Sequence, residues 1–105
     1  MIVERVERDG YTDISIYNAG DLPWNAYRVT CMDIGYERET DKRAPPTVHI
    51  SLLTTTNPTV ENVRRLVAEY TYVADIAEAL QAEKRAAYAE KYGAHVHAST
   101  STTAE

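Results

Sequence analysis

Apolar residues recur at steps of three and four near the C-terminus, which predicts one long amphipathic helix over about residues 58–92. The stripe consists of Val63, Leu66, Val67, Tyr70, Val73, Ala74, Ala77 and Leu80, and it continues through Tyr88 and Tyr92. Asn57 can cap the first turn through its side-chain oxygen, and Pro58 suits the first helical position. Gly93 can adopt the left-handed conformation that commonly ends a helix.

Before the helix, four stretches have the alternation and the bounding turn residues of β-strands. We predict strands at about residues 2–8, 11–18, 24–33 and 47–54. Asp9 and Gly10 are a strong signal for a tight hairpin between the first two strands, because both residues tolerate a positive φ. The charged stretch 36–46, which ends in two prolines, is expected to be a loop.

Four strands followed by one helix predict an α+β fold with two layers, a four-stranded antiparallel sheet packed against the helix in the order β-β-β-β-α. Residues 1–93 are expected to form a single domain, and residues 94–105 a polar tail rich in serine and threonine. The sheet face toward the helix is expected to carry Ile14, Ile16, Tyr27, Val29, Val48, Ile50 and Leu52. The opposite face is then polar enough to meet water.

The predicted helix is longer than the sheet it should cover. It would span about 50 Å at 1.5 Å per residue, whereas strands of six or seven residues span about 20–25 Å. We therefore expect the distal part of the helix to extend past the sheet and to contact another chain. The alternative is a helix that breaks near residues 81–83 and folds back onto its own domain.

The expected contact lies along the same stripe and the tyrosines that follow it. Its predicted residues are Tyr70, Tyr72, Val73, Ile76, Ala77, Leu80, Ala87, Tyr88 and Tyr92. The partner is expected to be a second copy of the chain, giving a homodimer, or another protein. Replacing Leu80 with Glu is expected to dissociate that assembly while the proximal fold stays intact.

Composition and charge narrow the class of protein. The net charge of −5 argues against a general polyanion binder, so we do not expect nucleic-acid binding. No stretch approaches the roughly 18 apolar residues of a membrane span, and the N-terminus lacks the apolar core of a signal peptide. The lone Cys31 fits a reducing compartment, so we expect a cytoplasmic protein.

Candidate catalytic residues are sparse. Cys31 and His49 form the only thiol–imidazole combination before the tail, and the predicted alternation places them on opposite faces of the sheet. Asp13, Ser15 and Ser51 share the outer face with His49, but no nucleophile elbow or glycine-rich oxyanion loop accompanies them. We therefore expect a protein that is not an enzyme and that has no cofactor.

Metal binding has equally little support in the sequence. His95 and His97 alternate around Val96 and could face one metal ion in an extended segment. Two ligands make a weak site, and no cysteine or acidic residue lies close to them in the sequence. We expect no metal site.

The pattern as a whole favours a small non-enzymatic protein-interaction module that self-associates or docks on a partner through its long helix. One alternative is a nucleic-acid-associated factor that uses the outer sheet face, where Tyr11, Tyr17 and Arg28 could stack with bases. A second alternative, based on composition alone, is a small phage virion or accessory structural component.

Overall fold

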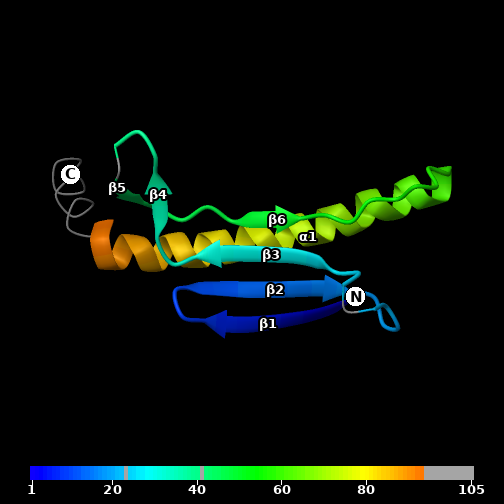
Figure 1. Ribbon diagram of the computed structural model, residues 1–105, viewed down its shortest axis with the longest axis horizontal. Coiled ribbons are helices and arrows are strands. Elements are labelled where there is room, and N and C mark those ends of the chain that lie inside the picture. Colours follow the sequence, from blue (N-terminus) through cyan, green and yellow to red (C-terminus); the bar gives the residue numbers. More distant parts are fainter. Residues whose placement is uncertain (23, 41, 94–105) are drawn as a thin grey trace, which may run out of the picture.

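The computed structural model describes residues 1–22, 24–40 and 42–93, and it confirms the predicted α+β fold (Figure 1). The four main strands are β1 (Ile2–Arg8), β2 (Tyr11–Tyr17), β3 (Tyr27–Met32) and β6 (His49–Ser51). They form one antiparallel sheet in the order β1-β2-β3-β6. The helix α1 (Val60–Tyr88) lies along this sheet and continues as a π-helical turn, η1 (Ala89–Gly93).

The alternation along β2 and β3 decides which face of the sheet is buried. Thr12, Ile14 and Ile16 of β2 are buried, and the residues between them are partly exposed. Gly10 has a φ of 87°, which suits the tight turn that joins β1 to β2. Because this turn fixes Arg8 opposite Tyr11, it also sets the register in which the apolar residues face the helix.

A second, two-stranded sheet lies where a loop was expected, so the loop prediction for residues 36–46 is wrong. Its strands are β4 (Gly35–Glu37) and β5 (Lys42–Ala44), and they pair in an antiparallel manner. Gly35 makes this geometry possible, since a Cβ atom there would lie 2.4 Å from the carbonyl oxygen of Pro45. The side chains of this hairpin are mostly charged and exposed, so its strands lack the alternation of apolar and polar residues from which strands are predicted.

The helix begins at a different cap from the predicted one. Thr59 is the N-cap, in an extended conformation, and its side-chain oxygen accepts a hydrogen bond from the Asn62 backbone N–H at 3.2 Å. Asn57 instead uses its backbone carbonyl oxygen to accept a hydrogen bond from the Asn62 side chain at 2.8 Å. The helix is continuous through residues 81–83, so the alternative of a break there is also wrong.

The core forms where the middle of α1 crosses the inner face of the sheet. Val73, Ala77 and Leu80 are the buried residues of the helix. Together with the sheet residues Ile14, Ile16, Tyr27, Val29 and Cys31, they form one apolar cluster. Removal of these side chains from water is the main stabilising contribution to a domain of this size.

Polar contacts attach the distal half of α1 to the same sheet. Arg5 of β1 forms an ion pair with Glu83, and Lys84 pairs with Asp33 at 2.6 Å. On the other side, the Gln81 side chain accepts a hydrogen bond from the Val48 N–H at 2.9 Å. The distal half of the helix is therefore held by β1, by the residues after β3 and by the segment before β6.

The expected overhang exists, but it lies at the opposite end of the helix. Val60, Val63 and Val67, in the first two turns of α1, are 66%, 46% and 59% exposed. Figure 1 shows this end of the helix extending past the sheet, while the distal end lies beside β4 and β5. The prediction of a distal overhang is wrong because the second hairpin and the residues after β3 occupy that region.

Leu80 tests the position of the core. Its side chain is only 2% exposed, so Leu80→Ala should lower the free energy of unfolding by about 2–5 kcal/mol. Val67→Ala, at an exposed position of the same helix, is the control and should change it by less than about 0.5 kcal/mol. Urea denaturation followed by circular dichroism measures both. Equal effects of the two substitutions would contradict the assignment of Leu80 to the core. Because Leu80 is buried, Leu80→Glu should unfold the domain, whereas its place in the helical stripe predicted only the dissociation of an assembly.

Glu83 tests the ion pair between β1 and the helix. The Arg5 guanidinium, which hydrogen-bonds to Glu83, lowers the pKa of that carboxyl group below its usual 4.5. A lowered pKa contributes stability above about pH 4.5, and the contribution is lost as the pH falls through the folded-state pKa. Because both side chains are substantially exposed, we expect Glu83→Gln to cost only about 0.2–1 kcal/mol at neutral pH.

The measurement is the free energy of unfolding of both proteins from neutral pH to about pH 3. The difference between wild type and Glu83→Gln should shrink toward the acid end. Glu78→Gln, which removes another exposed glutamate of α1, is the control for the loss of one negative charge. A difference that is constant across the pH range would contradict a folded-state ion pair with Arg5.

Candidate protein-interaction surface

The predicted contact residues occupy three different environments. Val73, Ala77 and Leu80 lie in the core, with Tyr70 and Ile76 packed against it. The Tyr70 ring stands edge-on to Tyr27, with ring centroids 6.0 Å apart, and its hydroxyl donates to the carbonyl oxygen of Leu53. The other members of the predicted set are Tyr72, Ala87, Tyr88 and Tyr92, which lie nearer the surface. The helical stripe therefore combines the core of the single chain with separate surface positions.

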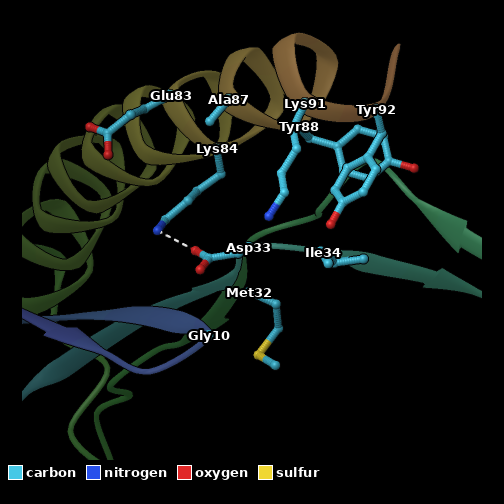
Figure 2. A pocket seen from close by; sticks show the side chains of 10 residues that line it. All are labelled: Gly10, Met32, Asp33, Ile34, Glu83, Lys84, Ala87, Tyr88, Lys91 and Tyr92. Atoms are coloured by element: carbon cyan, nitrogen blue, oxygen red, sulfur yellow. Dashed lines mark hydrogen bonds and ion pairs between the residues drawn. The ribbon is translucent and has the colours of Figure 1, made fainter.

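Tyr88 and Tyr92 line a cleft at the distal end of α1 (Figure 2). Their ring centroids are 5.1 Å apart, and the guanidinium of Arg43 from β5 lies 4.1 Å from the Tyr92 centroid. The cleft has a volume of about 550 Å³ and is bordered on the sheet side by Met32 and Ile34. The tyrosines are thus partly covered by residues of their own chain.

The charged groups in this cleft largely neutralise each other. Lys84 is bound to Asp33, as Figure 2 shows, and the ammonium group of Lys91 lies 5.4 Å from the centroid of the Tyr92 ring. The cleft has a volume within the range of small-molecule sites. Its described lining contains no cysteine, serine or histidine side chain, and the one polar pair that it holds is the ion pair between Lys84 and Asp33.

A second surface lies at the overhanging start of α1, and we call it the helix arm. It comprises helix residues 60–67 together with the segment 52–59, which runs from β6 along the helix to its tip (Figure 1). On the sheet side, Asn18 and Tyr27 both hydrogen-bond to Glu69. The sheet therefore ends near Glu69, and the turns of α1 before that residue have no sheet beneath them.

The helix arm exposes an unusual amount of apolar surface. Val60, Val63 and Val67 are exposed on the helix, and Leu52 is 48% exposed on the segment beside it. Single exposed apolar residues are normal in soluble proteins. The three valines, however, recur at steps of three and four and so share one face of the helix, and grouped exposure of this kind is typical of an interaction site. No polar side chain of the sheet can cover these valines, because the sheet has already ended.

The β2–β3 connection adds further apolar side chains at the same end of the sheet. Leu22 is 54% exposed and Trp24 is 77% exposed. The connection runs between Asn18 and Tyr27, the two residues that hydrogen-bond to Glu69. Tryptophan is strongly enriched among the residues that dominate binding energy in protein interfaces. Tyr27, which hydrogen-bonds to Glu69, is buried. Its desolvation is the main cause that raises the pKa of its hydroxyl, and the hydrogen bond to Glu69 is the second.

The candidate catalytic residues remain apart. Cys31 is fully buried on the inner face of the sheet, and its burial raises the pKa of its thiol. His49 lies opposite Thr30 in the β3–β6 register and is exposed on the outer face. Within residues 1–22, 24–40 and 42–93, no three His, Cys, Asp or Glu side chains could hold a metal ion. His95 and His97 lie outside the described residues.

On the outer face of the sheet, Asp13 and Glu4 both have partners within the chain. Arg28 forms an ion pair with Asp13 at 3.0 Å, and Thr30 donates a hydrogen bond to the same carboxylate at 2.5 Å. The Tyr17 hydroxyl donates to Glu4, so one of the tyrosines expected to stack with bases lies beside an acid.

In the part of the chain that the structure describes, no helix is long and apolar enough to cross a membrane.

Comparison with known proteins adds no family to this description. No protein-family model, curated protein or solved structure matches the chain. The fold and its surfaces therefore define the class that can be stated, an α+β protein of two layers with an apolar helix arm beyond its sheet.

Sequence reasoning found the mismatch in length but not the residues that it exposes. Val63 and Val67 belonged to the predicted stripe and were expected to face the sheet, while Trp24 was placed within a strand. The proline at position 58 and the threonines before it were the signal in the sequence that could have indicated an overhang at the start of the helix. These residues place the chain reversal at the helix start, away from the short fourth strand.

Proposed function

We propose that this chain is a small non-enzymatic protein-interaction module that docks on a partner protein through the helix arm. The observation that carries this proposal is the group of exposed valines at residues 60, 63 and 67, beyond the end of the sheet. In a single chain these side chains stay in contact with water. A partner that covers them gains about 25 cal/mol for each Å² of apolar surface removed from water.

The composition of the surrounding residues fits a protein partner. Interfaces between proteins combine an apolar centre with aromatic anchors and a polar rim. Here Leu52 and the valines form the apolar part, and Trp24 is available as an anchor at the same end of the sheet. Glu61, Arg64 and Arg65 supply charges of both signs on other faces of the first helical turns. Two arginines against one glutamate give the arm a net charge of only +1, and the whole chain carries −5, which is little positive charge for binding nucleic acid.

The two alternatives receive less support from the geometry. For nucleic-acid binding, Arg28, the arginine expected to contact bases, is already paired with Asp13, and Glu4 adds a second acid to the same face of the sheet. For a phage virion or accessory component, the surfaces of the described residues favour no particular assembly. Both stay alternatives to the interaction module.

A charge placed on the arm should abolish partner binding without unfolding the domain. Val67→Glu introduces a carboxylate among the exposed valines, where docking would have to desolvate it. Ala68→Glu is the matched control, since it adds the same side chain one residue further along, about 100° around the helix. Both positions are exposed, so each variant should retain its stability to within about 0.5 kcal/mol.

The measurement is quantitative affinity purification of the tagged full chain from its own cells. We expect one protein to be recovered in stoichiometric amount with wild type and with Ala68→Glu, and to be lost with Val67→Glu. Recovery that is equal for all three chains would reject the arm as the contact. Absence of any stoichiometric protein, with the purified chain monomeric, would reject the proposed function itself.

Trp24 provides an intrinsic reporter for the same event. It is the only tryptophan of the chain and is 77% exposed, so its fluorescence reports from water in the unbound protein. Addition of the partner should shift its emission to shorter wavelength as the indole is desolvated, and Val67→Glu should remove the shift. A partner that binds with unchanged emission would place the contact away from the β2–β3 connection.

A further inference from the structure

The outer edge of β1 is open along the whole length of the strand. All seven residues of β1 are exposed, and the strand pairs with β2 on one side only (Figure 1). Alternate residues of such an edge direct their N–H and C=O groups outward, so the edge can pair with a further strand. The helix packs chiefly over β3, which leaves the β1 edge accessible in the plane of the sheet.

The charges along this edge are complementary to themselves in the antiparallel direction. Their order is Glu4, Arg5, Val6, Glu7 and Arg8. When Val6 of two chains face each other, Glu4 lies opposite the second chain's position 8, and Arg5 opposite its position 7. A two-fold axis repeats both pairs, so four pairs of opposite charge flank one apolar pair. Because Arg5 already forms ion pairs with Glu7 and Glu83 of its own chain, the outer pairs of Glu4 and Arg8 supply the new attraction.

The neighbouring registers are electrostatically unfavourable. Paired residues of an antiparallel sheet point to the same face, so the two-fold axis can pass only through successive residues of the strand. An axis at Arg5 places two arginines opposite each other, and an axis at Glu7 places two glutamates opposite each other. Like charges in directly opposed positions destabilise a sheet, so among axes at residues 4–8 only the one at Val6 avoids them. Axes at Ile2 or Val3 pair fewer residues and place no opposite charges of the two strands against each other.

The outer pair of this register combines an arginine without a partner among the described residues and Glu4, which accepts a hydrogen bond from Tyr17. Glu4 and Arg8 are exposed and point to the outer face, where β1 pairs them with Ser15 and Tyr11 of β2. Arg8 has no hydrogen bond or ion pair with any other residue that the structure describes. Charges on a sheet edge normally discourage pairing. Here, by contrast, their order leaves one favourable partner, a second copy of the same edge.

We propose that two copies of this chain pair through antiparallel β1 strands about a two-fold axis at Val6, which joins their sheets into one continuous sheet. This contact uses a different surface from the helix arm, and it does not depend on the function proposed for the arm. Val6, which is 39% exposed in the single chain, becomes the central residue of the contact.

Charge reversal tests the pairing directly. Glu4→Arg and Arg8→Glu each turn two attractive pairs into repulsive ones. Each should therefore raise the dissociation constant of the dimer about tenfold. The double variant E4R/R8E restores opposite charges across the axis and should recover the dimer. A mixture of the two single variants should form a heterodimer, because every pair between unlike chains is then attractive.

Sedimentation velocity on the full chain measures these states against the chain mass of 11.8 kDa. Circular dichroism confirms that each variant is folded, which is expected because both positions are exposed. A wild-type monomer at about 100 μM would overturn the proposal, as would a dimer that all charge variants leave unchanged. A dimer that only Val67→Glu disrupts would assign self-association to the helix arm and also overturn it.

Engineered cysteines test the register. Val6→Cys places two thiols opposite each other at the axis, within the Cα–Cα range of about 4.4–6.8 Å that a disulfide requires. Val3→Cys is the matched control, since Val3 has similar exposure but faces position 9 of the second chain. Mild oxidation should cross-link Val6→Cys and leave Val3→Cys monomeric on a denaturing gel. Equal cross-linking of the two variants would overturn the proposed register.

Discussion

The packing of Val73, Ala77 and Leu80 against the inner face of β2 and β3 holds the two layers of this protein together. These three helix residues lie in the middle of α1, so the apolar contact covers only part of its length. Polar contacts extend the attachment toward the distal end, through Glu83 and Lys84. The position of this short contact determines which parts of the helix remain outside the core.

The sequence allowed the first hairpin of the sheet to be predicted well because local chemistry determined it, whereas the fourth strand is shorter than predicted and leaves Ile50 and Leu52 exposed. Asp9 and Gly10 specified the first hairpin, and strict alternation in β2 placed Ile14 and Ile16 toward the helix. Register and burial follow from such signals because a one-residue shift would expose every apolar side chain of the strand. The bounds of β1 and β2 accordingly agree with the predicted ones to within a residue.

The parts that could not be predicted depend on tertiary structure. A helical stripe shows which face is apolar, but Val63 on the overhang and Val73 in the core satisfy the same periodicity. Which of them is buried depends on where the sheet lies beneath the helix. The β4–β5 hairpin was missed for a related reason, because its pairing rests on the close backbone approach at Gly35 and on charged strands without an apolar face. The overhang of the helix was therefore expected at the wrong end.

The helical conformation of residues 60–67 in the arm depends on residues outside that range. Two helical turns without a packed layer are marginal in water by themselves, so the cap at Thr59 and the continuation of α1 into the core keep the arm helical. In the partner binding that we propose for the arm, fraying of these turns would lower the fraction of molecules in the binding conformation and would reduce the apparent affinity in the same proportion. Thr59 would thereby govern how strongly the valines hold a ligand, although its own hydroxyl is occupied within the helix.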